Sequence, residues 1–304
     1  MPPSTPGSAM SDPTTAMVDS RPRGLAGDAW NDLRRSKIFW TSSVLVFLIL
    51  LMAFFPTLFT SADPTDCALS RQHDGPSGGA LFGYDFQGCD VLARTVHGAG
   101  NSIQVGLVST LLAGLIGLCF GMAAGYFGGA VDAVLSRGID IVLGIPFLLG
   151  AVVFSGRLSG AGDDGVTAVT LTLGLLTWTS AARVMRSSVV AAKNQDYVAA
   201  ARMLGASPAR LMFRHILPNA IAPFIVVMAL LLGANIAAEA TLSYLRVGLK
   251  GEAISWGLQI ADAQKHARAA AAPLVWPSVF LAATVLAFIM LGDAIRDAFD
   301  PKLR

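Results

Sequence analysis

Apolar stretches with few or no charges alternate with polar, turn-rich segments along most of this 304-residue chain. The first apolar stretch, residues 38–60, carries no charge and is long enough to cross a bilayer about 30 Å thick at 1.5 Å per helical residue. The pattern predicts an all-α polytopic membrane protein with about six transmembrane helices. The further apolar stretches are residues 101–127, 139–156, 166–182, 219–240 and 275–292.

The segments between these stretches differ in composition. Residues 1–37 begin with a run rich in Pro, Ser, Thr and Gly that lacks an apolar period, which predicts a cytoplasmic and largely disordered tail. Residues 61–100 contain repeated turn signals such as Asp63-Pro64 and predict an extracytoplasmic loop. The other predicted segments are a first transmembrane helix at 38–60, a transmembrane core at 101–292 that includes a cytoplasmic loop at 183–218, and a cytoplasmic C-terminal tail at 293–304.

Positive charges directly precede the first apolar stretch and predict its orientation. Arg34, Arg35 and Lys37 lie at its N-terminal edge, and Lys and Arg are retained on the cytoplasmic side of membrane helices. Six spans would then place both termini in the cytoplasm. With this arrangement most of the 22 Lys and Arg residues fall on the cytoplasmic side.

The overall composition excludes an ordinary soluble domain. Only 14% of the residues are charged and 54% are hydrophobic, whereas soluble domains carry about 25% charged residues. The net charge of +2 gives no indication of a nucleic-acid partner. The sequence has no Gly-x-x-x-x-Gly-Lys-Ser/Thr phosphate loop and no Cys/His cluster with metal-ligand spacing. We therefore expect no catalysis, cofactor or metal site in this chain, and any ATP hydrolysis would have to be carried out by another protein chain.

Glycine and proline mark special positions inside the apolar stretches. Gly117, Gly121, Gly125 and Gly129 recur every four residues, so they would share one helix face and allow a second helix to approach closely. The alternative is that glycine is simply frequent in membrane helices. Pro146 lacks a backbone donor and predicts a kink or an interruption in the third stretch.

Two cysteines and one carboxylate are candidate special residues. Cys67 and Cys89 both fall in the predicted extracytoplasmic loop, an oxidising location, and we hypothesise a disulfide between them, with two free thiols as the alternative. Glu239 lies late in the fifth apolar stretch, where a charge is costly. It would therefore lie at the outer interface or face a water-filled path, either in a structural pairing or in contact with substrate.

The predicted cytoplasmic loop has strong local signals for two helices joined by a sharp corner. Residues 189–204 have a helix-forming composition, and Gly205 fits the left-handed residue that follows a helix. Ser207 is a candidate N-cap, with Pro208 at the favoured first helical position. A short second helix, residues 209–216, would end before Pro218 opens the fifth span.

The same loop resembles the EAA loop of ABC importer permeases. The family pattern is Glu-Ala-Ala, three residues, Gly, nine residues, Ile, any residue and Leu-Pro. Ala199 stands at the Glu position and His215 at the Ile position, and the His-Ile-Leu-Pro-Asn form at 215–219 is typical of the oligopeptide, dipeptide and nickel branch. The positions that match the pattern in register are Ala200, Ala201, Gly205, Leu217 and Pro218.

Other segments resemble the same branch, so the likeness covers roughly residues 80–304. The C-terminal segment, with Leu-Gly-Asp-Ala-Ile-Arg-Asp-Ala-Phe-Asp-Pro, resembles the signature of the C-type subunit. Cys89 stands where the family usually has Arg, and Arg246 where it has Gly. The similar segments are residues 83–99, 137–146, 239–248 with 255–257, and 286–304.

The resemblance implies the type I ABC importer permease fold in a prokaryotic cytoplasmic membrane. It also implies three kinds of partner. A homologous second permease would complete the path, and an extracytoplasmic protein would bind the solute. ATP and Mg would bind to two P-loop ATPase subunits or to one fused ATPase. The loop would contact the ATPase; alternatively, its arginines are ordinary inside-positive residues, and His215 makes a polar contact at a helix end. The implied contact residues are Tyr197, Ala200, Ala201, Arg202, Gly205, Ala206, Ser207, Arg210, Arg214, His215, Leu217 and Pro218.

These observations favour a non-catalytic permease subunit of an ATP-driven importer that forms half of a path for oligopeptides or dipeptides. Nickel or haem is the alternative cargo within the same branch. A secondary transporter would need ionisable residues at mid-membrane and repeated halves, neither of which is evident. A membrane receptor or assembly protein would not need the bent helical loop.

Overall fold

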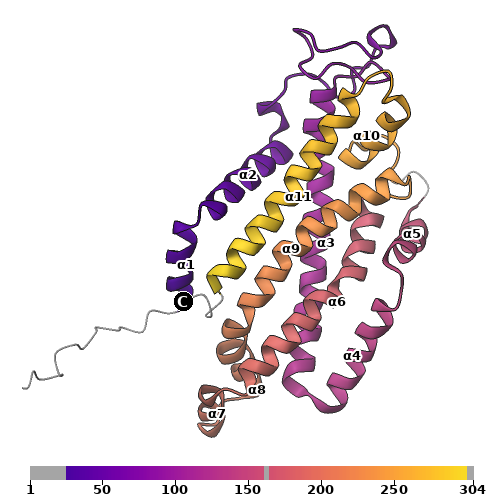
Figure 1. Ribbon diagram of the computed structural model, residues 1–304. Coiled ribbons are helices and arrows are strands. Elements are labelled where there is room, and N and C mark those ends of the chain that lie inside the picture. The colour runs from indigo at the N-terminus through magenta and orange to yellow at the C-terminus, as the bar shows by residue number, and fades with distance from the viewer. Residues whose placement is uncertain (1–24, 161–163, 300–304) are drawn as a thin grey trace, which may run out of the picture.

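The computed structural model describes residues 25–160 and 164–299, and these form an elongated bundle of helices without a β-strand (Figure 1). The all-α prediction is confirmed. The long helices are α2 (Lys37–Phe54), α3 (Val91–Phe127), α6 (Val166–Lys193), α9 (Leu217–Tyr244) and α11 (Ala272–Phe299). The shorter ones are α1 (Leu25–Arg35), α4 (Gly129–Leu143), α5 (Phe147–Leu158), α7 (Asp196–Met203), α8 (Pro208–Arg210) and α10 (Trp256–Ala263), with single turns η2 (Pro56–Leu58), η3 (Leu69–Arg71) and η5 (Gln264–His266) and a π-helical segment η4 (Leu211–Ile216).

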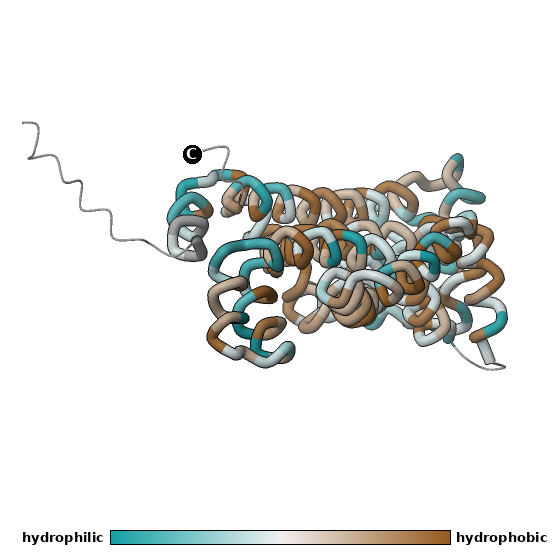
Figure 2. Tube along the Cα trace, turned by 90° about the horizontal axis from the view of Figure 1, so that it is seen from below, coloured by the Kyte–Doolittle hydropathy of each residue, from teal (hydrophilic) through white to brown (hydrophobic). Residues whose placement is uncertain are grey.

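Four helical segments in the described part of the chain are long and apolar enough to cross a membrane. They are α2, α3, the continuous segment Pro208–Tyr244 and α11, and the bent pair α4–α5 would make a fifth span. The remaining predicted stretch, residues 166–182, lies in α6, which is long enough but more polar. Because α6 packs between α3, α5 and α9, it needs less lipid-facing apolar surface. Figure 2 shows hydrophobic residues through most of the bundle.

Several segment boundaries differ from the predicted ones. α3 begins at Val91, inside the predicted loop 61–100, because Asp90 accepts a hydrogen bond from the N–H of Ala93 at 3.0 Å and caps the helix. Residues 25–35 form α1, although we expected disorder throughout most of 1–37; residues 1–24 lie outside the described part. α11 runs on to Phe299, beyond the predicted end at 292, and residues 300–304 are also outside.

Pro146 interrupts the third apolar stretch, as predicted. α4 ends at Leu143, α5 begins at Phe147, and their axes differ by 90°. Pro146 has no N–H to continue the hydrogen-bond ladder of α4, so the chain turns here and starts a new helix. α4 and α5 therefore form a bent pair on one side of the bundle (Figure 1).

Glycines bring α3 and α6 into close contact over much of their length. A Cβ on Gly117 would lie 2.6 Å from the Cβ of Ala181, and one on Gly125 would lie 2.8 Å from the Cβ of Val189. Gly121 is equally close to α6. Real Cβ atoms do not tolerate such distances, so larger residues would push the two helices apart.

Gly129 does not belong to this contact, contrary to the predicted packing role. A Cβ there would meet nothing within 4 Å. Instead, Gly128 and Gly129 have φ values of +68° and +53° and turn the chain from α3 into α4. L-residues rarely adopt this left-handed region, so the repeat serves packing at three positions and chain reversal at the fourth.

Candidate functional site: the hairpin between α6 and α9

A helical hairpin, residues 196–216, protrudes at one end of the molecule (Figure 1). It consists of α7, a corner at residues 204–207, α8 and η4, and it connects α6 to α9. The long loop between α2 and α3 lies at the opposite end of the bundle. The sequence predicted two helices with a sharp corner here, but the first, predicted at residues 189–204, is divided, because α6 runs on to Lys193 and α7 begins only at Asp196.

Paired hydrogen bonds close the corner after α7. Gly205, with φ +79°, donates its N–H to the carbonyl oxygen of Arg202 at 3.0 Å, and Ala206 donates to that of Ala201 at 3.1 Å. These two bonds satisfy carbonyls that the end of a helix leaves free, and they need a left-handed residue at position 205. A side chain there would be strained even though its Cβ would meet nothing within 4 Å.

The second arm of the hairpin begins with the predicted N-cap and proline, but it does not end at the predicted residue. Ser207 Oγ accepts a hydrogen bond from the N–H of Arg210 at 3.4 Å, and Pro208 occupies the first turn. The predicted end of the short helix before Pro218 is wrong, because the arm continues through η4 into α9. In η4 the N–H of Leu217 bonds to the carbonyl of Met212, five residues back, and this wider turn accommodates the proline that follows.

An apolar core fixes the hairpin to the bundle. Val198 on α7 and Leu211 and Ile216 on η4 are fully or almost fully buried. They pack in one cluster with residues of α3, α6 and α9, among them Met185 and Val189 of α6. Because both arms share this cluster with α6, a displacement of the hairpin would also displace the helix ends that it connects.

The tip of the hairpin exposes apolar side chains that face no part of the described chain. Met203 is 83% exposed and Leu204 is 89% exposed, next to the exposed cation of Arg202. Phe213 on the second arm is 62% exposed. Exposed apolar groups beside arginine are typical of protein interfaces. The sequence reasoning missed these residues, although two apolar residues directly before a helix-ending glycine at a polar corner are a usable signal.

The predicted contact residues fall into an exposed set and a packed set. Tyr197, Ala200, Arg202, Gly205, Ser207, Arg210, Arg214 and Pro218 are exposed; Ala201, Ala206, His215 and Leu217 are half-buried. Three of the half-buried residues, Ala201, Ala206 and Leu217, pack against the apolar cluster under the hairpin. The exposed set therefore offers a surface, while these three help to hold it in place.

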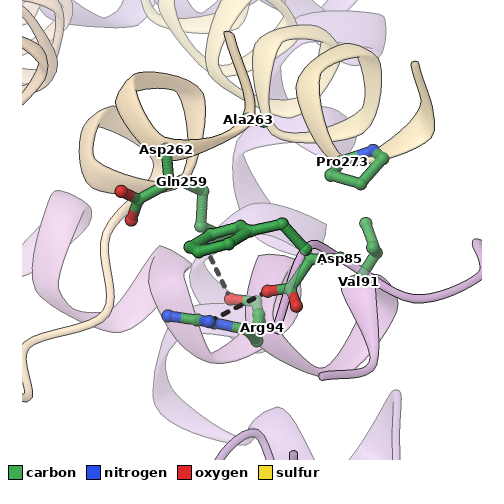
Figure 3. A pocket seen from close by; sticks show the side chains of 8 residues that line it. Asp85, Val91, Arg94, Gln259, Asp262, Ala263 and Pro273 are labelled. Carbon is green, nitrogen blue, oxygen red and sulfur yellow. Dashed lines mark hydrogen bonds and ion pairs between the residues drawn. The ribbon is translucent and has the colours of Figure 1, made fainter. Parts of the chain in front are cut away.

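The opposite end of the molecule forms a cap, defined here as residues 55–90 together with residues 245–271. A disulfide joins Cys67 to Cys89, the pairing that we hypothesised. Arg94, at the start of α3, donates to Asp85 at 3.0 Å, and its carbonyl oxygen accepts from Gln259 of α10 at 2.9 Å. Figure 3 shows these side chains around a cavity of about 20 Å³. Such a cavity holds about one water molecule, so it is not a cargo site.

Short hydrogen bonds also order the surface of the cap. Thr65 donates both its hydroxyl and its N–H to Asp63 Oδ1, at 2.6 and 2.8 Å, and these bonds lower the pKa of the Asp63 carboxyl below its ordinary value. The guanidinium of Arg71 lies 4.9 Å from the ring centre of Tyr84. The loop between α2 and α3 is therefore a folded element.

Glu239 is buried inside the chain in a polar contact, so of the two roles left open the structure has the structural pairing, and the side chain does not line a water-filled path. Its side chain is 0% exposed within this chain alone, so no partner is needed to cover it. Ser243 Oγ donates to its Oε1 at 2.8 Å, and the hydroxyls of Ser102 and Ser255 face the same carboxyl group. The carboxyl group thus lies where α9, α3 and the start of α10 meet, and its Oε2 has no hydrogen-bond partner among the described residues. The described residues contain no group of three or more His, Cys, Asp or Glu that could hold a metal ion.

Comparisons with known proteins support the same family. The family described as "Binding-protein-dependent transport system inner membrane component" matches residues 117–304, and the "N-terminal TM domain of oligopeptide transport permease C" matches residues 24–76. The oligopeptide transport system permease protein OppC of Bacillus subtilis (strain 168) is 34% identical over 287 residues, which cover 94% of this chain and 93% of that protein.

Two other relatives and one solved structure support the same family assignment. The dipeptide permease DppC of the same Bacillus strain is 34% identical over 91% of this chain and 86% of its own length. The glutathione permease GsiD of Pectobacterium atrosepticum is 29% identical over 90% of both chains. A structure titled as an amino acid ABC transporter with histidines has a similar fold, with a TM-score of 0.52 and 19% identity over 66% of this chain and 91% of that one. The chain therefore belongs to the inner membrane permeases of binding-protein-dependent ABC transport systems, within their OppC and DppC group.

Proposed function

We propose that this chain is the C-type permease of an ATP-driven peptide importer and that its hairpin, residues 196–216, receives the movement of a P-loop ATPase. The observation that carries the coupling role is the combination of a buried attachment and an exposed tip. Val198 and Leu211 fix the hairpin to α6 and α9, whereas Met203 and Leu204 are free for a partner. ATP and Mg bind to that partner, and this chain supplies half of the path.

Two features at opposite ends of the bundle support one orientation of the chain in the membrane. The cap contains a disulfide, which persists in an oxidising compartment, so the cap faces outward. The hairpin carries exposed arginines at positions 202, 210 and 214 and therefore faces the cytoplasm, with both termini on the same side. A solute-binding protein would deliver peptide to the cap, and a homologous permease would complete the path in the cytoplasmic membrane.

Peptide as the cargo is supported by the relatives, which are named as permeases for oligopeptides, dipeptides and glutathione. Vesicles containing the full complex should take up a labelled di- or oligopeptide when supplied with ATP and binding protein. Uptake of nickel or haem in place of peptide would contradict the cargo assignment and leave the permease role intact.

Gly205→Val tests the coupling role. The substitution strains the left-handed corner by about 1 kcal/mol or more and tilts the tip away from the ATPase. We expect ATP hydrolysis to continue while peptide uptake falls severalfold. Gly160→Val is the matched control, because Gly160 has no positive φ and a Cβ there meets nothing within 4 Å. Wild-type uptake per ATP in Gly205→Val would contradict the proposal.

A further inference from the structure

α4 is held to the bundle by little apolar packing. Among its described side chains only Ile139 is buried, where it contacts a small cluster that includes Trp178 of α6. Val134 and Ile141 are 69% and 71% exposed. Polar contacts therefore matter more for the position of α4 than for the positions of the long helices.

The strongest of these polar contacts joins α4 to α6. Arg186 donates from Nε to Asp132 Oδ1 at 2.5 Å and from Nη2 to Asp132 Oδ2 at 2.6 Å. Ser136 adds a third hydrogen bond to the same carboxylate at 3.2 Å. The two side chains are only 39% and 24% exposed. A two-pronged, partly buried pair of this kind fixes both the distance and the relative orientation of the two groups.

Neighbouring residues on the same face of α6 contact the C-terminal end of α3, directly before the chain turns into α4. Val189 packs against Gly125, and Lys193 Nζ donates to the carbonyl oxygens of Gly125 and Tyr126 at 3.0 and 2.9 Å. Positions 186, 189 and 193 are spaced for one helix face. The last two turns of α6 thus contact both α3 and α4, and α6 ends at Lys193, directly before the hairpin.

We propose that the Asp132–Arg186 ion pair is a positioning contact that makes α4 follow α6 when the hairpin moves. This inference rests on the proposed coupling role of the hairpin. α4 continues through the 90° bend at Pro146 into α5, so a movement of its cytoplasmic end reorients the bent pair. The Asp132–Arg186 ion pair would thus link the ATPase contact to α4 and α5, a part of the membrane domain that apolar packing holds only weakly.

The test is a double-mutant cycle in the reconstituted full complex. Asp132→Asn and Arg186→Gln each leave one charge without its partner, whereas the double variant removes both charges. The readout is peptide uptake per ATP hydrolysed, together with the amount of assembled complex. Asp140→Asn is the matched control on the same helix, because among the described residues Asp140 forms an ion pair with Arg137 of α4, at 3.7 Å and with both side chains exposed.

We expect each single variant to assemble and to lower uptake per ATP about five- to tenfold. The double variant should be no worse than the worse single variant, since both substitutions remove the same contact. Unchanged coupling in the single variants, multiplied defects in the double variant, or failure of all three to assemble would each overturn the positioning role. If the wild-type complex itself transports no peptide, the proposed function fails, which is a separate result.

Discussion

The cap and the hairpin are held in opposite ways. The cap is cross-linked: a disulfide closes the loop between α2 and α3, and the rings of Phe82 and Trp276 stack with centres 3.9 Å apart. Arg246 forms an ion pair with Asp262 there. The hairpin has no covalent link and depends on one apolar cluster, while its tip stays exposed. The difference indicates that the cap keeps a fixed shape, whereas the hairpin moves with α6 and α9 as one unit.

The largest expected effect comes from damage to the apolar attachment of the hairpin. Val198→Asp places a charge in a fully buried site, and we expect a destabilisation of several kcal/mol and loss of ATPase binding. Co-purification of the ATPase with the permease measures this. Ala199→Asp is the matched control, because Ala199 is exposed and lies next to Val198. If both variants retain the ATPase equally well, the apolar attachment is not what positions the hairpin.

The second effect concerns the cap alone. Replacing Cys67 and Cys89 by Ser opens a link across 22 residues and should destabilise the cap by about 3 kcal/mol. Limited proteolysis of the loop between α2 and α3 should become faster, whereas ATPase binding at the hairpin stays unchanged. Loss of ATPase binding in this variant would contradict the separation between the two ends.

Features of the cap and the hairpin that depend on neighbouring residues could be predicted from the sequence, whereas features that depend on contacts between distant residues could not. The corner at Gly205 and Ser207 could be predicted because a helix stop and a helix cap are local features. The continuation of the second arm past Pro218 could not, because it depends on the wider turn of η4. The burial of Glu239 depends on hydroxyl groups from α3 and from the start of α10, which are distant in sequence.

The boundaries of the helices were also hard to predict where they depend on contacts between distant residues. The tail before the first span was predicted as largely disordered, yet residues 25–35 form α1, in which Leu33 packs with Ala298 of α11. That contact joins the two ends of the described chain, so no local pattern indicates it. The exposed tip residues Met203 and Leu204 are not among the predicted contact residues, although they directly precede Gly205.

The smallest effect is expected at Arg246, where the family usually has glycine. Arg246 has φ +62°, so Arg246→Gly should relieve about 1 kcal/mol of backbone strain. It also removes the partly exposed ion pair with Asp262, worth about 0–1 kcal/mol. We expect the thermal stability of the cap to change by less than about 1 kcal/mol, as measured by thermal unfolding. A much larger loss would show that this ion pair is a main support of the cap.

Site-specific cross-linking tests most directly whether the hairpin tip receives the ATPase. In a Cys119→Ala background, which removes the free thiol, Leu204→Cys places a reactive group at the tip and Leu69→Cys places one on the cap, where Leu69 is 74% exposed. A short thiol cross-linker applied to the purified complex should join position 204, and not position 69, to the P-loop ATPase. A cross-link to the ATPase from position 69, with none from position 204, would contradict the account.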